Sequence, residues 1–339
     1  MRPGIKSGLG LLLALVVVAA AGLGAYVVGS TWLLGRRASP SGTAMTVEIP
    51  KGASLDQASR LLAKAGVIDW PRLFMLAGRL TSDDGPILAG EYELSPAMSA
   101  ARILDFLRLG RVKLHYVLIP EGFTLRQIAA RLGHEGVASD GTALELGLSA
   151  SFAADLGIGE PGLEGYLFPD TYRFPRNLGA RAALSAMARR FDQVWRKLAP
   201  AAKAAGMSQR RAVILASIIQ RETATESEMP LISAVYHNRL KKGMRLQADP
   251  TVIYGLGAAF DGDLTRADLE GDTPYNTYTR HGLPPGPICS PGRAALEAAI
   301  HPAKAPYLYF VARGDGGHKF SVTYAQHVRA VDKYQRHRQ

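Results

Sequence analysis

One glutamate of this sequence stands out because of the residues that precede it. Glu222 follows Leu215, Ile218 and Ile219 by seven, four and three residues, so a helix over 211–225 would carry all four side chains on one face. Burial disfavours the charged form of a carboxyl group and raises its pKa. A general acid that protonates a glycosidic oxygen near neutral pH needs a raised pKa. The position alone leaves open a structural glutamate that pairs with an arginine or caps a neighbouring helix.

Two further acidic residues compete with Glu222 for this role. Glu226 would lie one helical turn after it, and Glu228 lies near Pro230 at the expected start of the next helix. A carboxylate is favoured at a helix N-terminus, where backbone N–H groups lack partners. We therefore expect Glu228 to cap that helix and Glu226 to be exposed.

The segments that follow are dense in uncharged polar and aromatic residues. Amides and hydroxyls can hydrogen-bond the hydroxyl groups of a sugar, and aromatic rings can pack on its apolar faces. Loops that are merely solvated have the same composition, so the pattern indicates a sugar site without establishing one. The segments are 238–240, 244–251, 275–278 and the Pro/Gly-rich 282–288.

The elements that must position these residues show mixed periodicities. Apolar residues recur at helical spacing over 181–198, 210–225, 230–242 and 293–300, whereas 307–311 has the composition of a strand. This mixture predicts an α+β fold.

A short internal repeat lies upstream of these helices. Residues 47–58 resemble residues 117–128: in each copy a β-branched strand ends at proline, glycine makes the turn, and a hydroxyl residue begins a helix. Ser54 and Thr124 each precede a glutamine by three residues, which is the spacing of a capping box. The two copies predict one small structural unit that is used twice.

The first copy belongs to a small module. A predicted helix over 71–80 and a predicted strand over 90–94 follow it. Strand–helix–helix–strand is the order of a LysM module, which binds glycan. We therefore expect a LysM-like α/β module over 45–112 and a catalytic domain over 113–339, with a packing or spacer domain without ligand as the alternative for the module.

The N-terminal region predicts a membrane anchor. Residues 7–35 contain no charged side chain, and about 20 apolar residues suffice to span a bilayer. We predict a cytoplasmic tail over 1–7, a transmembrane helix over 8–34 and a linker over 35–44. A cleaved signal peptide is the rival interpretation, because small residues at 19–21 could form a cleavage site. In both interpretations the rest of the chain is exported across the membrane.

Composition narrows the remaining function classes. The formal net charge of +11 indicates an anionic partner. We expect no nucleic acid, because no RNP, zinc-finger or helix-turn-helix signature is visible. Cys289 is the only cysteine, so no disulfide can form within the chain, and we interpret it as a packed residue rather than a nucleophile. The eight histidines show no pair at ligand spacing, so we expect no metal and no other cofactor.

Several of these segments together resemble a known family of enzymes. The chain is similar to the endolytic lytic transglycosylases, also called MltG or YceG-like proteins. The motifs that carry the resemblance occur in the family's order at 119–122, 163–172, 215–223, 238–240, 243–254, 275–278, 282–286, 301–303 and 307–311.

The resemblance implies a set of site residues and a helical core like that of lysozyme. The Glu-Thr pair at 222–223 corresponds to the family's catalytic glutamate and makes Glu222 the acid/base. Gln220 departs from the family, which often has a second glutamate at that position; we expect little effect, since its side chain would point away from that of Glu222. The substrate-binding residues implied by the matched motifs are Glu164, Tyr166, Asn238, Gln247, Asp249, Tyr275, Asn276, Thr277 and Tyr278.

The family's reaction is a non-hydrolytic cleavage of peptidoglycan. The resemblance implies that Glu222 protonates the glycosidic oxygen that follows N-acetylmuramic acid and then deprotonates the C6 hydroxyl, which closes a 1,6-anhydro ring. It also implies the cytoplasmic membrane of a bacterium as location, an extracytoplasmic catalytic domain, nascent glycan strands as substrate and peptidoglycan synthases as candidate partners. The alternatives are a muramidase that uses water and a non-catalytic, membrane-tethered scaffold that binds peptidoglycan.

Overall fold

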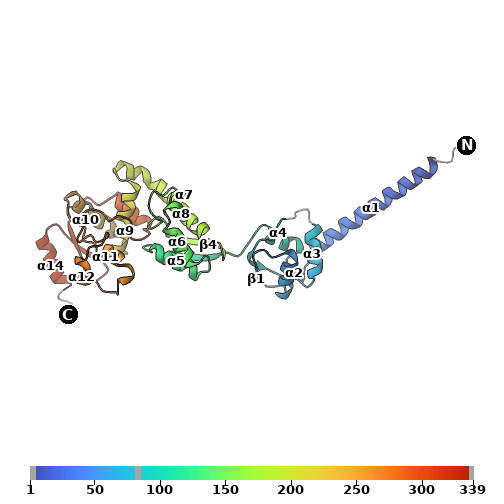
Figure 1. Cartoon of the computed structure of the whole chain (residues 1–339), viewed down its shortest axis with the longest axis horizontal. Helices are drawn as coiled ribbons and strands as arrows, with labels where there is room; N and C mark the ends of the chain where they lie inside the picture. The colour runs from blue at the N-terminus through green and yellow to red at the C-terminus, as the bar shows by residue number, and fades with distance from the viewer. Residues whose placement is uncertain (1–4, 81–84, 336–339) are drawn as a thin grey trace. The chain divides into compact units, whose positions relative to one another are not determined.

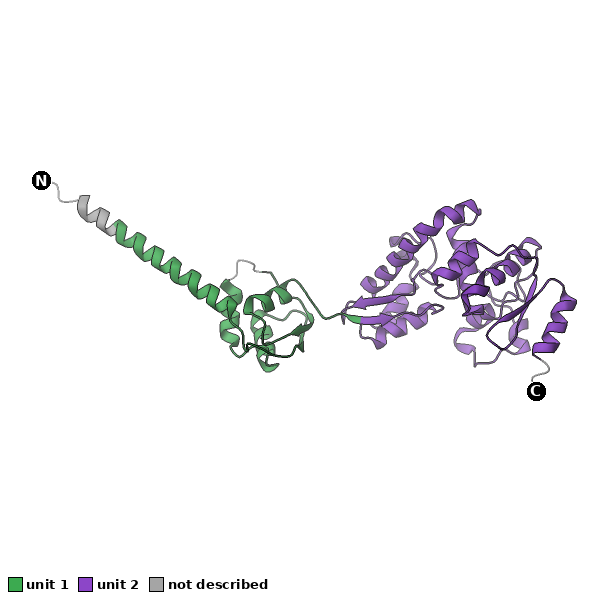
Figure 2. Ribbon diagram, turned by 180° about the vertical axis from the view of Figure 1, so that it is seen from behind, with its two compact units in different colours: residues 1–115 green, residues 116–339 purple. Residues whose placement is uncertain are grey.

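The computed structural model of the chain describes residues 5–80 and 85–335. It contains two compact units, residues 1–115 and 116–339 (Figures 1 and 2). We describe each unit by itself. Both contain helices together with two-stranded sheets, so the expectation of an α+β fold is confirmed.

The first unit begins with the apolar helix α1, Ile5–Gly35. Its segment Leu12–Gly35 is 24 residues long and is apolar enough to cross a membrane. Almost all side chains of this segment are exposed, which is consistent with a helix that spans a membrane. The predicted tail over 1–7 lies mostly outside the described residues.

The rest of the first unit forms a small α/β module. Its elements follow the predicted order: β1 (Met45–Ile49), α2 (Leu55–Lys64), α3 (Pro71–Leu80), β2 (Gly90–Leu94) and α4 (Ala100–Arg108). The strands β1 and β2 pair antiparallel. Ser54 and Gln57 form the predicted capping box at the start of α2. Val47, Phe74 and Tyr92 are buried in a core shared by both strands and the helices.

The predicted linker over 35–44 is attached to this module by hydrogen bonds. The backbone N–H groups of Ala38 and Ser39 both donate to the carbonyl oxygen of Pro96 at 3.1 Å. The hydroxyl of Ser95 donates to the carbonyl oxygen of Gly42 at 2.8 Å. The segment after α1 therefore follows the surface of the module and is not a free tether.

The second unit starts with the second copy of the repeat. Thr124 and Gln127 form the predicted capping box at the start of α5. The strands β3 and β4 pair in a two-stranded sheet. The elements of this part are β3 (His115–Leu118), α5 (Leu125–His134), α6 (Asp140–Gly147), α7 (Ala150–Asp155), β4 (Thr171–Phe174) and the long α8 (Ala180–Ala204).

The centre of the second unit is α9, Gln209–Glu222, which packs against α8, α10, α11 and α13. All eight residues from Ala212 to Ile219 are buried, so α9 is enclosed on every side and not on one face alone. The helix ends at Glu222, three residues earlier than predicted, because Thr223 is extended. The neighbouring helices are α10 (Met229–Lys241), α11 (Asp249–Leu256), α12 (Arg266–Glu270) and α13 (Arg293–Ile300).

The chain closes with a hairpin and a helix. Strands β5 (Tyr309–Ala312) and β6 (His318–Ser321) pair antiparallel, and α14 (Tyr324–Tyr334) packs on both. Short 3-10 turns also occur at Glu226–Glu228 and Gly257–Ala259.

Candidate active site

Glu222 is the last residue of α9, and its carboxyl group is partly buried beside α10. Burial raises the pKa of Glu222 to about 7. A hydrogen bond from the Tyr236 hydroxyl favours the ionised form and partly offsets this effect. The nearby charge of Asp249 also raises the pKa, and the charge of Arg239 lowers it. Glu222 can therefore hold a proton and release it near neutral pH, as an acid that later serves as a base must do.

The carboxyl group of Glu222 lines a cleft of about 450 Å³ in the second unit. The end of α9 and the turn before α11 supply one part of the wall, while β5, β6 and α14 supply another. Three residues predicted to bind substrate line the same cleft: Gln247, Asp249 and Tyr278. The structure thus brings the predicted acid together with part of the predicted binding set.

Gln247 is held in the cleft by a strained turn. Its φ of 49° lies in the left-handed region, which residues with a side chain rarely adopt. Its backbone N–H donates to the carbonyl oxygen of Thr277 at 3.1 Å, and the N–H of Ala248 donates to the Thr277 hydroxyl at 3.0 Å. Thr277 itself is buried, so it positions this turn from the inside of the molecule.

Asp249 begins α11 and accepts a hydrogen bond from the hydroxyl of Tyr278. Burial is the main cause that raises the pKa of Tyr278, and its bond to Asp249 adds to the effect. Tyr278 therefore remains a neutral donor over the physiological range. The pair presents a carboxylate and a phenol to the same cleft as Glu222.

Arg239 and Tyr236 were not among the residues singled out from the sequence. The guanidinium of Arg239 is buried, donates to the carbonyl oxygens of Leu308 (2.7 Å) and Leu246 (2.6 Å), and lines the cleft. It therefore holds β5 and the Gln247 turn together and places a positive charge near Glu222. Both residues lie in α10 and are three positions apart, so the sequence alone could have placed them on one face of a helix.

A histidine–glutamate pair lies at the edge of the cleft. Nδ1 of His318 is 2.6 Å from Glu228 Oε2, and the backbone N–H of His318 donates to Oε1 at 2.9 Å. The prediction that the Glu228 side chain caps the next helix is wrong: Glu228 precedes α10, but its carboxylate binds β6 instead. Glu226 is exposed, as predicted. His318 lines the cleft, so Glu228 positions a cleft residue.

Three other residues predicted to bind substrate make hydrogen bonds or packing contacts within the protein. Asn276 is buried; its amide donates to the carbonyl oxygens of Leu269 and Gly271, and its own oxygen accepts the N–H of Tyr278 at 2.8 Å. Asn238 donates to the carbonyl oxygens of Ala305 and Tyr307. The remaining residue, Tyr166, is buried against the ring of Phe191. None of the three lines the cleft described above.

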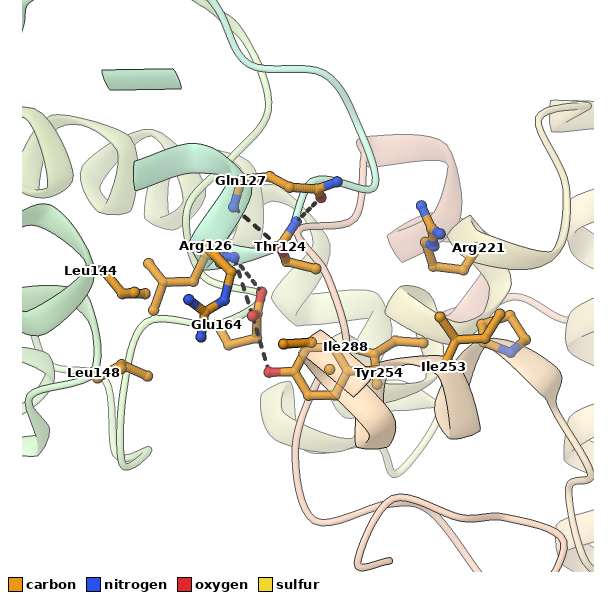
Figure 3. A pocket seen from close by; sticks show the side chains of 14 residues that line it. Thr124, Arg126, Gln127, Leu144, Leu148, Glu164, Arg221, Ile253, Tyr254 and Ile288 are labelled. Carbon is orange, nitrogen blue, oxygen red and sulfur yellow. Dashed lines mark hydrogen bonds between the residues drawn. The ribbon is translucent and has the colours of Figure 1, made fainter. Parts of the chain in front are cut away.

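Glu164 and Tyr275 lie elsewhere, at a second pocket of about 500 Å³ (Figure 3). Both carboxylate oxygens of Glu164 accept the backbone N–H of Leu125, at 3.0 and 3.1 Å, and Oε2 also accepts the hydroxyl of Tyr254. Burial raises the pKa of Glu164 to about 7. Tyr275 packs on Tyr254, whose ring lines the pocket.

Gln220 and Cys289 have structural roles. Oε1 of Gln220 accepts the backbone N–H of Gly292 at the start of α13, at 2.9 Å. Cys289 is buried, its thiol donates to the carbonyl oxygen of Ser217, and burial raises its pKa, which disfavours the reactive thiolate. Within residues 5–80 and 85–335, no group of three or more His, Cys, Asp or Glu side chains is arranged to hold a metal ion.

Comparison with known proteins identifies the family. The sequence model of the YceG-like family matches residues 47–333, which is most of the chain. The chain belongs to the YceG-like family. It is 33% identical over 328 residues to the endolytic murein transglycosylase of Bacillus subtilis, covering 92% of this chain and 90% of that protein.

Two further YceG-like comparisons agree. The endolytic murein transglycosylase of Streptococcus pneumoniae is 28% identical over 298 residues, and the match spans 79% of this chain but 54% of that longer protein. The crystal structure of a putative YceG-like protein from Listeria monocytogenes aligns with a TM-score of 0.59 at 35% identity, covering 85% of this chain and 99% of that one. The resemblance inferred from the motifs is therefore confirmed.

Proposed function

We propose that this YceG-like protein is a membrane-anchored endolytic transglycosylase that cuts the glycan strands of peptidoglycan. The observation that carries the proposal is the position of Glu222: a carboxyl group with a pKa of about 7 at the wall of a cleft lined by polar and aromatic side chains. The names of the curated relatives support the same activity.

Glu222 carries both proton transfers in the proposed reaction. Its protonated form donates to the glycosidic oxygen between N-acetylmuramic acid and N-acetylglucosamine, and the C1–O bond breaks to an oxocarbenium-like state. The resulting carboxylate then takes the proton of the muramic acid C6 hydroxyl while that oxygen bonds to C1. The products are a 1,6-anhydro end and a free 4-hydroxyl, and Glu222 is protonated again.

The cleft residues have separate tasks in this proposal. Gln247, Tyr278 and Asp249 contact the sugar, because their polar groups line the same cleft as Glu222. Arg239 and Tyr236 tune the proton affinity of Glu222. Thr277, Asn276 and Asn238 are positioning residues that hold the turn and the strand from which the cleft is built.

A hydrolytic muramidase is the second candidate, and Asp249 is the observation that favours it. Hydrolases of glycosides generally use two carboxyl groups, and Asp249 is a second one in the same cleft. We favour the transglycosylase because Asp249 is already engaged by Tyr278. The two reactions leave different ends, since only the hydrolase leaves a reducing sugar.

The remaining parts of the proposal concern the anchor and the first unit. We place residues 1–7 in the cytoplasm and both compact units outside it, with α1 as the single membrane span.

The order β1–α2–α3–β2 supports a LysM-like module that binds glycan. The packing of α8, α10 and α13 around α9 supports a lysozyme-like core. Peptidoglycan synthases are the proposed partners, because an anchored enzyme meets strands as they leave the membrane.

The test compares the full chain in detergent with its Glu222→Gln and Glu226→Gln variants. Each is incubated with purified peptidoglycan, and the released fragments are weighed by mass spectrometry. We expect anhydro ends from the wild type and from Glu226→Gln, and a loss of about 100-fold or more in Glu222→Gln. Reducing ends would support the muramidase. Binding without cleavage by the wild type would support a scaffold, and equal cleavage by all three would place the acid elsewhere.

A further inference from the structure

The second pocket is lined by residues of four helices and of the loops at Glu164 and Ile288. Figure 3 shows side chains from α5, α6, α9 and α11 around one hollow, with Glu164 beneath the start of α5. Neither the cleavage reaction nor the Glu222 cleft uses this hollow. Its volume of about 500 Å³ is in the range of sites for small ligands.

The walls of the second pocket are mostly aliphatic. Leu144, Leu148, Ile253 and Ile288 supply much of the lining, and their side chains surround the hollow in Figure 3. Such a surface suits methyl and methylene groups. It suits a sugar poorly, because a sugar ring presents hydroxyl groups on its whole rim, and each buried hydroxyl needs a hydrogen-bond partner.

Charged groups occur at two places in this lining. Arg126 and Arg221 both line the pocket and have exposed side chains, and no carboxylate of the described residues forms an ion pair with either. Their guanidinium groups are therefore available to carboxylates of a ligand, which arginine binds in a bidentate way. Glu164 lies deeper, beside Tyr254. An amphipathic ligand with methyl groups and free carboxylates matches this arrangement.

The second pocket adjoins the catalytic cleft through the backbone. Arg221 lines the pocket and the next residue, Glu222, lines the cleft; likewise Asp249 lines the cleft and Pro250 lines the pocket. Consecutive Cα atoms are about 3.8 Å apart. The two cavities therefore border the same short segments of α9 and α11.

We propose that the second pocket binds the stem peptide carried by the muramic acid next to the bond that is cut. This assignment rests on the proposed function, since it takes peptidoglycan as the substrate. The peptide branches from the sugar that reacts at Glu222; its alanine residues bear methyl groups, and free carboxylates occur along it and at its end. Leu144, Leu148 and Ile253 receive the methyl groups, and Arg126 and Arg221 bind the carboxylates.

Glu164 is the hydrogen-bonding group inside this pocket. Its carboxyl is fixed by the N–H of Leu125 and the hydroxyl of Tyr254, so it is oriented before any ligand enters. When protonated, it can donate to a peptide carbonyl oxygen; when ionised, it can accept a peptide N–H. Either hydrogen bond would recognise the backbone of the peptide and not its side chains.

The experiment compares two substrates that differ only in their peptides. Uncross-linked strands are used intact or after an amidase has removed their stem peptides, and kcat/KM for anhydro-end formation is measured with the full chain in detergent. Arg126→Gln removes one guanidinium, and Leu148→Trp fills the pocket from an exposed position. Arg189→Gln is the matched control, because Arg189 is an exposed arginine of the same unit, in α8, outside the lining.

We expect the wild type to prefer peptide-bearing strands. Arg126→Gln and Leu148→Trp should each lower kcat/KM on these strands about tenfold through a higher KM, a loss of about 1.4 kcal/mol of binding, and leave the peptide-free strands unaffected. Arg189→Gln should match the wild type on both. Equal use of both strands by the wild type, or equal losses on both strands in the variants, would overturn the assignment.

A binding measurement separates this inference from the proposed function. Calorimetric titration of a synthetic stem tetrapeptide into the full chain should show binding that Leu148→Trp abolishes and Arg189→Gln retains. If the wild type makes no anhydro ends but binds the tetrapeptide in this way, the proposed function fails and the pocket assignment stands. If it makes anhydro ends and no tetrapeptide binds at millimolar concentration, the pocket assignment fails alone.

Discussion

The hydroxyl of Tyr236 donates a 2.5 Å hydrogen bond to Oε1 of Glu222, from the middle of α10 to the end of α9. The bond stabilises the ionised carboxylate, whereas burial stabilises the neutral acid, and burial is the larger effect on the pKa. Because Tyr236 has its own pKa raised well above the usual value, it stays a donor at every physiological pH. Burial therefore keeps Glu222 protonated up to near neutrality, while the hydrogen bond from Tyr236 fixes its orientation.

Tyr236→Phe should shift the alkaline limb of the pH–rate profile upward. In the proposed mechanism activity needs protonated Glu222, so kcat/KM falls as the pH rises through its pKa of about 7. Loss of a bond that favours the ionised form raises that pKa further, by about 1 unit if the bond contributes about 1.4 kcal/mol. The measurement is kcat/KM for anhydro-end formation between pH 5 and 9. Tyr116→Phe, at an exposed residue of β3, is the control, and an unchanged limb in Tyr236→Phe would refute the tuning role.

Glu222→Gln should be more stable than the wild type in alkaline solution. The folded pKa of about 7 exceeds the ordinary value of 4.5, so the folded state binds this proton more tightly than the unfolded state. The resulting stabilisation is complete below pH 4.5 and is lost as the pH rises through 7. A permanently neutral glutamine avoids the loss, which amounts to about 1–3 kcal/mol of unfolding free energy.

Thermal denaturation of the full chain at about pH 4.5 and about pH 8 checks this prediction. The variant should have the higher Tm at the alkaline pH by several degrees and should match the wild type at the acidic pH. Glu226→Gln is the reference for a change of the same kind at an exposed glutamate. A lower Tm of Glu222→Gln at both pH values would show that its carboxylate stabilises the fold.

Glu228→Ala should weaken substrate binding and stability together. The substitution leaves the backbone N–H and Nδ1 of His318 without their acceptor, and His318 is largely buried at the cleft. An unsatisfied buried donor costs about 1–3 kcal/mol. We expect a lower Tm and a kcat/KM reduced about tenfold, chiefly through KM. Glu226→Ala in the same 3-10 turn should change neither quantity, and identical behaviour of the two variants would contradict the role of Glu228.

Gln247→Gly and Gln247→Ala should distinguish the contribution of the Gln247 side chain to activity from the cost of its backbone conformation to stability. Both variants lose the amide, so both should lower kcat/KM by at least about tenfold if the amide contacts the sugar. Only alanine retains the strain of a φ near 49°, so the glycine variant should have the larger unfolding free energy, by about 1 kcal/mol. Urea denaturation measures the difference. Near-normal activity of both variants would remove Gln247 from the substrate contacts.

Local signals in the sequence predicted several elements with their ends, whereas the helix predicted over 181–198 extends over Ala180–Ala204. The helices over 71–80 and 293–300 and the strand over 90–94 occur at the predicted residues. Both capping boxes form, because a hydroxyl residue and a glutamine three positions apart satisfy each other's backbone donors without tertiary help. The end of α9 was predicted too late, since no local residue marks the point where Thr223 becomes extended.

Only the tertiary structure decided which side chains share a cavity. The sequence singled out Glu222 and Gln247, but the contact of Tyr236 with Glu222 spans 14 residues and that of Glu228 with His318 spans 90. The fold also placed Glu164 at a different pocket. Periodicity within one helix specifies a face, whereas the partner of that face depends on how separate elements pack. The sequence by itself therefore indicated the family and the candidate acid, and the packing of α9, α10 and α11 determined which side chains surround that carboxyl group.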